Sequence, residues 1–141
     1  MFYNLAILVY TASIIFDAFT LTNSANEEQS IEGYTCLVLT MFGLFGFYAY
    51  CWANVLFLMW VCEARNTKRK KHCLVISTAA ILCAFSFLFE TKFPLDEAGI
   101  NYGTIQSYGL GFYLWCAAPV LGLIHSLTLK DDISQNASES T

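Results

Sequence analysis

Four stretches of the chain are almost entirely apolar, and polar segments separate them. The stretches cover residues 2–21, 34–62, 73–89 and 105–129. About 17 to 25 apolar helical residues cross the hydrocarbon layer of a bilayer, so each stretch is long enough to span it. Four strands could not close a barrel, and open strand edges are not tolerated in lipid. The pattern therefore predicts an all-α polytopic membrane protein whose residues 1–129 form a four-transmembrane-helix bundle.

The polar segments between these stretches differ in charge, which predicts an orientation. Five of the seven basic residues lie between Arg65 and Lys71, in the middle segment. The first and third segments hold six carboxylates, counting Glu90, against one base, Lys92. Short basic loops are retained on the cytoplasmic side of a membrane. We therefore predict a multi-pass protein of a cell (inner) membrane with cytoplasmic N- and C-termini, and residues 130–141 as a disordered polar cytoplasmic tail.

The composition supports the membrane assignment and argues against nucleic acid as a partner. Hydrophobic residues make up 57% of the 141 residues and charged residues only 13%, whereas soluble domains have about half and about a quarter. A soluble protein of this size would lack the polar residues to cover its surface. The net charge of −4 is also opposite to the broad basic face that a phosphate backbone requires.

Candidate catalytic and metal-binding motifs are missing from the sequence. The six cysteines include no closely spaced pair of the zinc or redox type. The set of His72, Cys62, Cys73 and Glu63 matches no zinc-ligand spacing. Neither histidine stands with a nucleophile and an acid in a catalytic order, and no glycine-rich phosphate loop is present. The sequence therefore predicts a protein that is not an enzyme and that needs no metal or cofactor.

Asp17 is the one carboxylate well inside a predicted span, which makes it a candidate for proton or cation coupling. Carboxylates in spans are costly, so they usually face the bundle or a wet cavity. However, Asp17 stands close to the end of its predicted helix. The alternative is an interfacial carboxylate that is hydrated from outside or paired with Lys92, Ser107 or Tyr108. Both interpretations remain open from the sequence.

Asn54 and Pro119 lie at comparable depths in the second and fourth predicted spans. A proline inside a helix leaves the carbonyl four residues earlier without its donor, and here that residue is Trp115. An asparagine amide on a neighbouring helix could donate to this carbonyl. We therefore expect an interhelical hydrogen bond from Asn54 to Trp115 beside a kink at Pro119, with a substrate ligand as the alternative role for Asn54.

The basic segment has two interpretations. It could contact anionic lipid headgroups, at about 1 kcal/mol for each base near the surface, or it could record orientation alone. The residues concerned are Arg65, Lys68, Arg69, Lys70 and Lys71.

These patterns favour a small integral membrane protein that acts without catalysis, through helix–helix contacts. An accessory, immunity-type or exclusion protein would fit, with the lipid bilayer, another membrane protein or a second copy of the chain as partner. The alternative is a subunit of a small oligomeric proton- or cation-coupled transporter or channel that uses Asp17. No motif in the sequence matches a named family.

Overall fold

The structure combines five α-helices with a small antiparallel sheet. The computed structural model describes residues 1–23, 26–43, 48–65, 69–95 and 101–129, so the predicted tail at 130–141 lies outside the described residues. In chain order the elements are α1 (Phe2–Ile15), β1 (Asp17–Thr22), β2 (Glu28–Glu32), α2 (Gly33–Gly43), α3 (Ala49–Glu63), α4 (Lys70–Ser86), the 3-10 helix η2 (Phe87–Phe89), β3 (Lys92–Pro94), β4 (Tyr102–Tyr108) and α5 (Leu110–Thr128).

The prediction of an all-α, four-transmembrane-helix bundle is therefore wrong. In the described part of the chain, two helical segments are long and apolar enough to cross a membrane, namely Lys70–Phe89, which joins α4 to η2, and α5 (Leu110–Thr128). The apolar helices α1 and α3 have only 14 and 15 residues, which correspond to about 21 and 22 Å. A four-stranded sheet accounts for much of the remaining sequence that was expected to be helical or loop.

Three of the four predicted spans are divided between different elements. The stretch 2–21 forms α1 and then most of β1. The stretch 34–62 forms α2 and α3, which are separate helices, and residues 44–47 between them lie outside the described residues. The stretch 105–129 begins as β4 and becomes helical only at Leu110. Only the stretch 73–89 is helical throughout.

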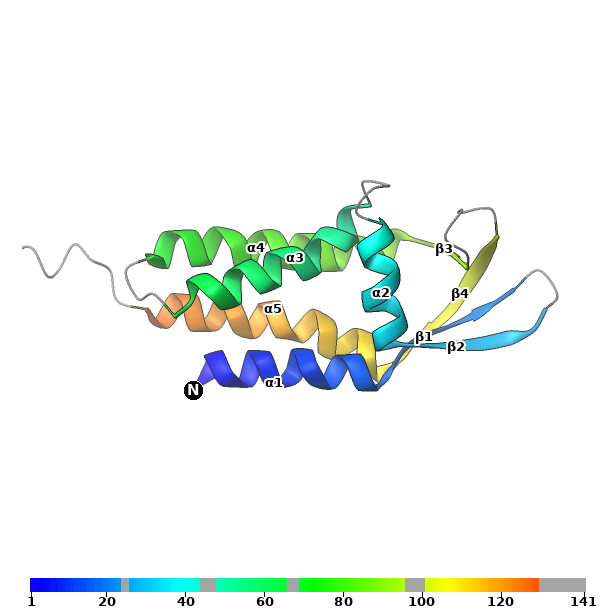
Figure 1. Ribbon diagram of the computed structural model, residues 1–141, viewed down its shortest axis with the longest axis horizontal. Coiled ribbons are helices and arrows are strands. Elements are labelled where there is room, and N and C mark those ends of the chain that lie inside the picture. The colour runs from blue at the N-terminus through cyan, green and yellow to red at the C-terminus, as the bar shows by residue number, and fades with distance from the viewer. Residues whose placement is uncertain (24–25, 44–47, 66–68, 96–100, 130–141) are drawn as a thin grey trace, which may run out of the picture.

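The helices α1, α5, α4 and α3 pack side by side in that spatial order, along the long axis of the molecule (Figure 1). The shorter α2 contacts α1 and α3 and runs across them near the sheet (Figure 1). The sheet projects from one end of the helical part, and the N-terminus lies at the other end. The helical part therefore has two different ends, one covered by strands and one formed by helix termini.

The strands pair antiparallel in the order β2-β1-β4-β3. The central pair joins segments that are far apart in the sequence, because Thr20 is opposite Ser107 and their hydroxyl oxygens lie 2.5 Å apart. Strand β1 buries Ala18, Phe19 and Leu21 against the protein, with an irregularity in its pairing with β2 between Asp17 and Phe19. The sheet is therefore part of the core and not a detached hairpin.

Aromatic side chains connect the sheet to the helices. The ring of Phe19 in β1 lies 5.4 Å from that of Phe87 in η2 and 4.9 Å from that of Phe93 in β3. Phe87 also lies 5.8 Å from Phe112 at the start of α5 and 5.0 Å from Tyr50 at the start of α3. Tilted and edge-on ring pairs at these separations are favourable, so this cluster holds the two parts of the molecule together.

A second core cluster lies toward the opposite end of the helices, around Trp60 of α3. Trp60 is almost fully buried, and its indole nitrogen donates to the Ser126 hydroxyl of α5 at 2.9 Å. Gly122 lies one turn earlier in α5 and leaves room for the indole because it has no side chain. A Cβ at this position would lie 3.1 Å from the ring. A small residue thus allows α5 and a large aromatic side chain to approach closely.

Backbone segments cross closely where α1 meets the sheet. The amide of Gly33 donates to the Phe16 carbonyl at 3.0 Å. A Cβ on Gly33 would collide with the Ser13 carbonyl oxygen, and one on Gly111 would lie 2.5 Å from the Phe16 oxygen. Glycine is required at these positions because the backbones approach too closely for any side chain.

Candidate functional site in the helical core

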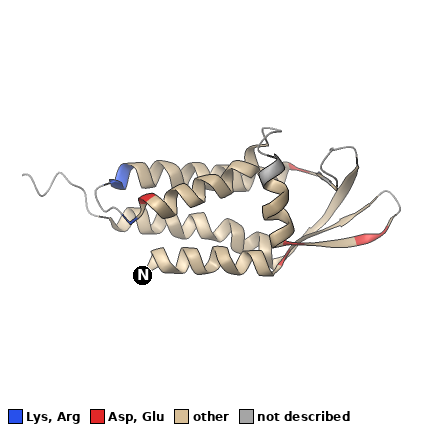
Figure 2. Ribbon diagram, in the orientation of Figure 1, with Lys and Arg blue, Asp and Glu red and all other residues tan. Residues whose placement is uncertain are grey.

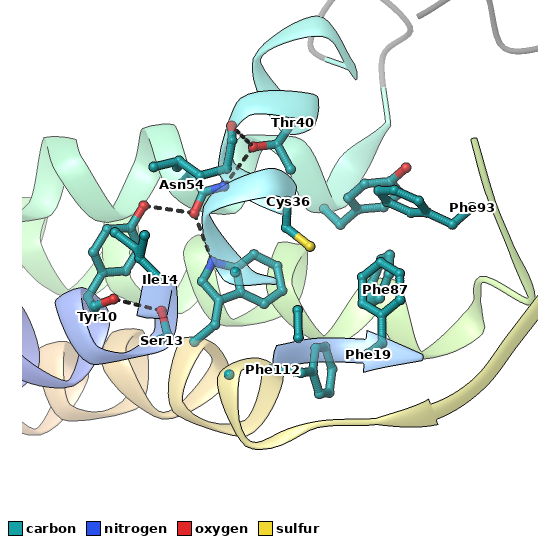
Figure 3. A pocket seen from close by; sticks show the side chains of 16 residues that line it. Tyr10, Ser13, Ile14, Phe19, Cys36, Thr40, Asn54, Phe87, Phe93 and Phe112 are labelled. Carbon is teal, nitrogen blue, oxygen red and sulfur yellow. Dashed lines mark hydrogen bonds between the residues drawn. The ribbon is translucent and has the colours of Figure 1, made fainter. Parts of the chain in front are cut away.

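A buried asparagine connects four helices through hydrogen bonds (Figure 3). The side chain of Asn54 in α3 accepts hydrogen bonds at Oδ1 from the Tyr10 hydroxyl of α1, at 2.9 Å, and from Trp115 Nε1 of α5, at 2.8 Å. Its Nδ2 donates to Thr40 Oγ1 of α2 at 3.0 Å. An amide suits this place because it provides both donors and acceptors at one point.

The neighbouring hydroxyl groups use helix carbonyls as their acceptors. Thr40 donates to the Leu37 carbonyl at 2.8 Å, and Ser13 donates to the Tyr10 carbonyl at 2.6 Å. Among the described residues, no buried side-chain nitrogen or oxygen is left without a hydrogen-bond partner. The network is therefore complete within the protein and leaves no unpaired group for a ligand.

A small cavity of about 50 Å³ lies between this network and the aromatic cluster (Figure 3). It could hold a few waters, since one water needs about 10–15 Å³ measured in this way. Small-molecule sites in proteins are typically about 300–1,000 Å³, so this cavity is too small for a metabolite. The lining is mostly apolar and comprises Tyr10, Ser13, Ile14, Ala18, Phe19, Gly33, Cys36, Leu37, Thr40, Tyr50, Asn54, Phe87, Phe93, Gly111, Phe112 and Trp115.

The structure brings Asn54 and Trp115 together, but through different atoms from those expected. The indole N–H of Trp115 donates to the Asn54 oxygen, whereas the expected bond ran from the Asn54 amide to the Trp115 carbonyl. Pro119 is buried inside α5, one turn beyond Trp115, and takes no part in the network. The sequence reasoning missed Tyr10 and Thr40, although each is a polar residue inside an otherwise apolar stretch.

Asp17 is placed outside the helices. It is the first residue of β1, its side chain is exposed, and it is paired in register with Glu32 of β2. Ser107, an expected partner, is bonded to Thr20 instead, and Lys92 lies in β3 opposite Thr104. Asp17 therefore lies at the start of β1 and takes no part in the hydrogen-bond network of Asn54.

The described residues of the basic segment lie at the end of the helical part opposite the sheet (Figure 2). Arg69 donates to both carboxylate oxygens of Glu63 at 2.8 Å. Arg65 donates to the Tyr3 hydroxyl at 3.1 Å, and this hydrogen bond raises the pKa of the guanidinium. Lys70 and Lys71 begin α4, whereas Lys68 lies outside the described residues.

Within the described ranges, no group of three or more His, Cys, Asp or Glu side chains could hold a metal ion. The six cysteines are free thiols, and Cys62 is the exposed one among them. Comparison of the chain with protein-family models, with curated proteins and with solved structures finds no match. The exposed surface and the charge distribution of this chain therefore provide the only basis for inferring its function.

Proposed function

We propose that the chain is a small integral membrane protein that acts through contacts within the bilayer and not through catalysis. In this proposal α4, extended by η2, and α5 cross the hydrocarbon layer. The shorter apolar helices α1 and α3 pack along them, and the sheet stands outside the bilayer. An accessory, immunity-type or exclusion protein of a cell (inner) membrane would have this organisation.

The observation that supports this proposal best is the exposure of apolar side chains along the helices. In α4 with η2 and in α5, only 28% and 39% of the most apolar 18 residues are buried, whereas a core helix of a soluble protein would be mostly buried. Large exposed apolar patches mark interaction or membrane surfaces. The exposed side chains on the helices include Leu5, Leu8, Ile15, Leu58, Met59, Val75, Leu82, Phe85, Tyr113, Val120, Ile124 and Leu127.

The distribution of charge supports the same orientation. The described helices carry Asp, Glu, Lys or Arg only at Glu63, Lys70 and Lys71, all at the end opposite the sheet (Figure 2). The sheet end carries acidic residues, with Lys92 as its base in the described part. Because basic residues are retained in the cytoplasm, we propose a cytoplasmic end that includes Met1 and Leu129, and an external sheet.

The transporter alternative has no specific support from the geometry. Asp17 is exposed in a strand, and among the described residues every buried side-chain nitrogen or oxygen has a hydrogen-bond partner. A coupling residue would need a buried or wet position along the path of the ion. We therefore propose that the protein acts through contacts within the bilayer and not as a transporter or channel subunit.

Labelling with a membrane-impermeant maleimide tests this arrangement in intact cells that express the chain. Native Cys62 is exposed at the end of α3 near the basic residues, so we expect it to react only after the membrane is permeabilised. In a Cys62→Ser background, Glu28→Cys places a thiol on the exposed strand β2. We expect this thiol to react in intact cells. Equal labelling of both positions before permeabilisation would contradict the proposal.

A photoreactive side chain at Leu82, which is 68% exposed on α4, tests the contact role in native membranes. The proposal predicts discrete protein adducts from at least one position on the exposed apolar surface. Lipid adducts alone at Leu82, Val120 and Leu8 would contradict a contact function. The matched control position is buried Ala80 on the same helix, which should give no adduct with another protein.

A further inference from the structure

The two outer strands of the sheet differ in their capacity to pair with a further strand. The strand order β2-β1-β4-β3 leaves β2 and β3 at the edges. Strand β3 has three residues and ends in Pro94, which has no backbone N–H to donate. Strand β2 has five residues and no proline, and its pairing with β1 is regular from Glu28 to Ile31. The edge of β2 is therefore the longer and the less blocked of the two.

The outer edge of β2 has no partner strand in the described part of the chain. Strand β2 pairs with β1 on its inner side, and the sheet order places no strand on its outer side. Residues 28–30 are exposed, and β2 projects away from the helices along one border of the sheet (Figure 1). An edge strand presents a row of unpaired N–H and C=O groups. The groups of this edge match the backbone of an extended peptide segment.

The side chains of β2 add a charge requirement. Successive side chains alternate between the two faces of a strand, so Glu28, Ser30 and Glu32 share one face. Glu32 is opposite Asp17 of β1, and like charges in this arrangement are destabilising. Among the described residues, no lysine or arginine forms an ion pair with Glu28 or Glu32. A basic side chain on an added strand would supply the missing counter-charge.

The same carboxylates disfavour a second copy of the chain as the added strand. If two copies of β2 pair antiparallel over their full length, Glu28 of each copy lies opposite Glu32 of the other. Like charges directly opposite each other are destabilising, whereas opposite charges there are favourable. Charged side chains on edge strands protect proteins against self-association in this way. The protection does not act against a strand of opposite charge.

We propose that the outer edge of β2 binds, by strand addition, an extended segment of another protein that carries lysine or arginine opposite Glu28 and Glu32. Main-chain hydrogen bonds provide the affinity, and the two carboxylates select the basic segment. The inference goes beyond the proposed contacts within the bilayer and does not depend on them, because the sheet projects from the helical part (Figure 1).

Backbone NMR of the full chain in zwitterionic micelles tests the proposal with a defined probe. The probe is the blocked peptide Lys-Val-Thr-Val-Lys, which reads the same in both directions and therefore fits either strand orientation. We expect it to shift the amide signals of β2. The control peptide Glu-Val-Thr-Val-Glu should bind about tenfold more weakly, because two opposite-charge pairs become like-charge pairs. Equal binding of the two peptides, signal changes centred on β3, or no change with the lysine peptide would overturn the proposal.

Selective N-methylation of the lysine peptide separates strand addition from charge attraction. The backbone amides of a strand point alternately to its two edges. Methylation of the two valine amides and methylation of the lysine and threonine amides therefore block opposite edges of the peptide. We expect one methylated peptide to lose binding and the other to keep it. Equal binding by both, or equal loss by both, would refute strand addition.

Two matched substitutions test whether the site is the edge of β2. Glu28→Lys and Glu90→Lys make the same charge change, but Glu28 is exposed on β2 and Glu90 follows η2. Glu28→Lys should weaken binding of the lysine peptide by about three- to tenfold, whereas Glu90→Lys should leave it within about twofold, because exposed charges farther away are screened. Equal losses for the two variants would mean that the peptide senses only the net charge of the sheet end, and would overturn the assignment to β2.

Discussion

Replacing Asn54 by leucine removes the one side chain that connects α1, α2, α3 and α5. The substitution keeps the number of side-chain heavy atoms but deletes three hydrogen bonds, of 2.8 to 3.0 Å, and leaves the buried donor of Tyr10 and the partly buried donor of Trp115 without an acceptor. Interhelical hydrogen bonds in membranes average about 0.6 kcal/mol each, which sums to about 2 kcal/mol. Donors that lose their partner can each cost about 1–3 kcal/mol. We therefore expect Asn54→Leu to lower the free energy of unfolding by about 2–4 kcal/mol.

The measurement is reversible unfolding in mixed micelles by titration with a denaturing detergent, followed by circular dichroism. A double-mutant cycle with Tyr10→Phe isolates one bond of the network, and we expect a coupling free energy of about 0.6 kcal/mol or more between the two sites. Leu58→Ala serves as a control on the same helix, because Leu58 is half exposed and its truncation should cost less than about 1 kcal/mol.

Two results would refute this account of the core. The first is a cost for Asn54→Leu no larger than that of Leu58→Ala. The second is additivity of Asn54→Leu and Tyr10→Phe, which would mean that the 2.9 Å contact between the two side chains does not contribute to stability.

Two further substitutions test other parts of the fold in the same unfolding assay. Gly111→Ala should cost about 1–3 kcal/mol, because the new Cβ would lie 2.5 Å from the backbone oxygen of Phe16. Gly103→Ala should cost less, because the nearest atom, at 2.8 Å, is a methyl carbon of the Leu21 side chain and not backbone. Trp60→Phe should cost about 1–3 kcal/mol, because it removes the donor to Ser126 at 2.9 Å from a fully buried site, and an unchanged stability would contradict this contact.

The stretch 2–21 shows why apolar runs were misleading here. A buried strand and a helix that faces lipid both require apolar residues, so length alone could not separate α1 from β1. The change occurs at Phe16, where the backbone becomes extended. Strand β1 is stabilised by pairing with β4, whose residues lie more than 80 positions later, and no local pattern reports a partner that far away. The same limit applies to β4, because it pairs with β1, whose residues lie more than 80 positions earlier.

The candidate site was partly accessible from sequence. A lone amide in an apolar stretch requires hydrogen-bond partners, so the sequence alone identifies Asn54 as a candidate. The identity of those partners depends on the packing of α2 across α1 and α3, which places Thr40 beside the amide. The break of the stretch 34–62 into two helices was not expected, so Thr40 could not be placed. The packing of the side chains also determines that Trp115 contacts Asn54 through its indole N–H and not through its backbone carbonyl.

Asp17 shows the same limit of sequence-based prediction for a residue that was expected inside a helix. Its depth was derived from a helix that was assumed to continue to Leu21, whereas α1 ends at Ile15 and the carboxylate is exposed at the start of a strand. Once the helix is shortened, the functional interpretation of Asp17 loses its premise. Charge segregation did not depend on helix boundaries. Among the described residues, the bases except Lys92 lie at the end opposite the sheet, and the carboxylates except Glu63 lie at the sheet end (Figure 2).

The central claim is that the exposed apolar surface of α4 and α5 faces lipid, and spin labels test it most directly. Labels at Leu82 and Val120, which are 68% and 36% exposed, are compared in reconstituted vesicles with a label at Glu28 on β2. We expect the two helix positions to be accessible to oxygen and protected from a water-soluble nickel complex, and Glu28 to show the reverse. Access of the nickel complex to Leu82 and Val120 as free as to Glu28 would contradict the account.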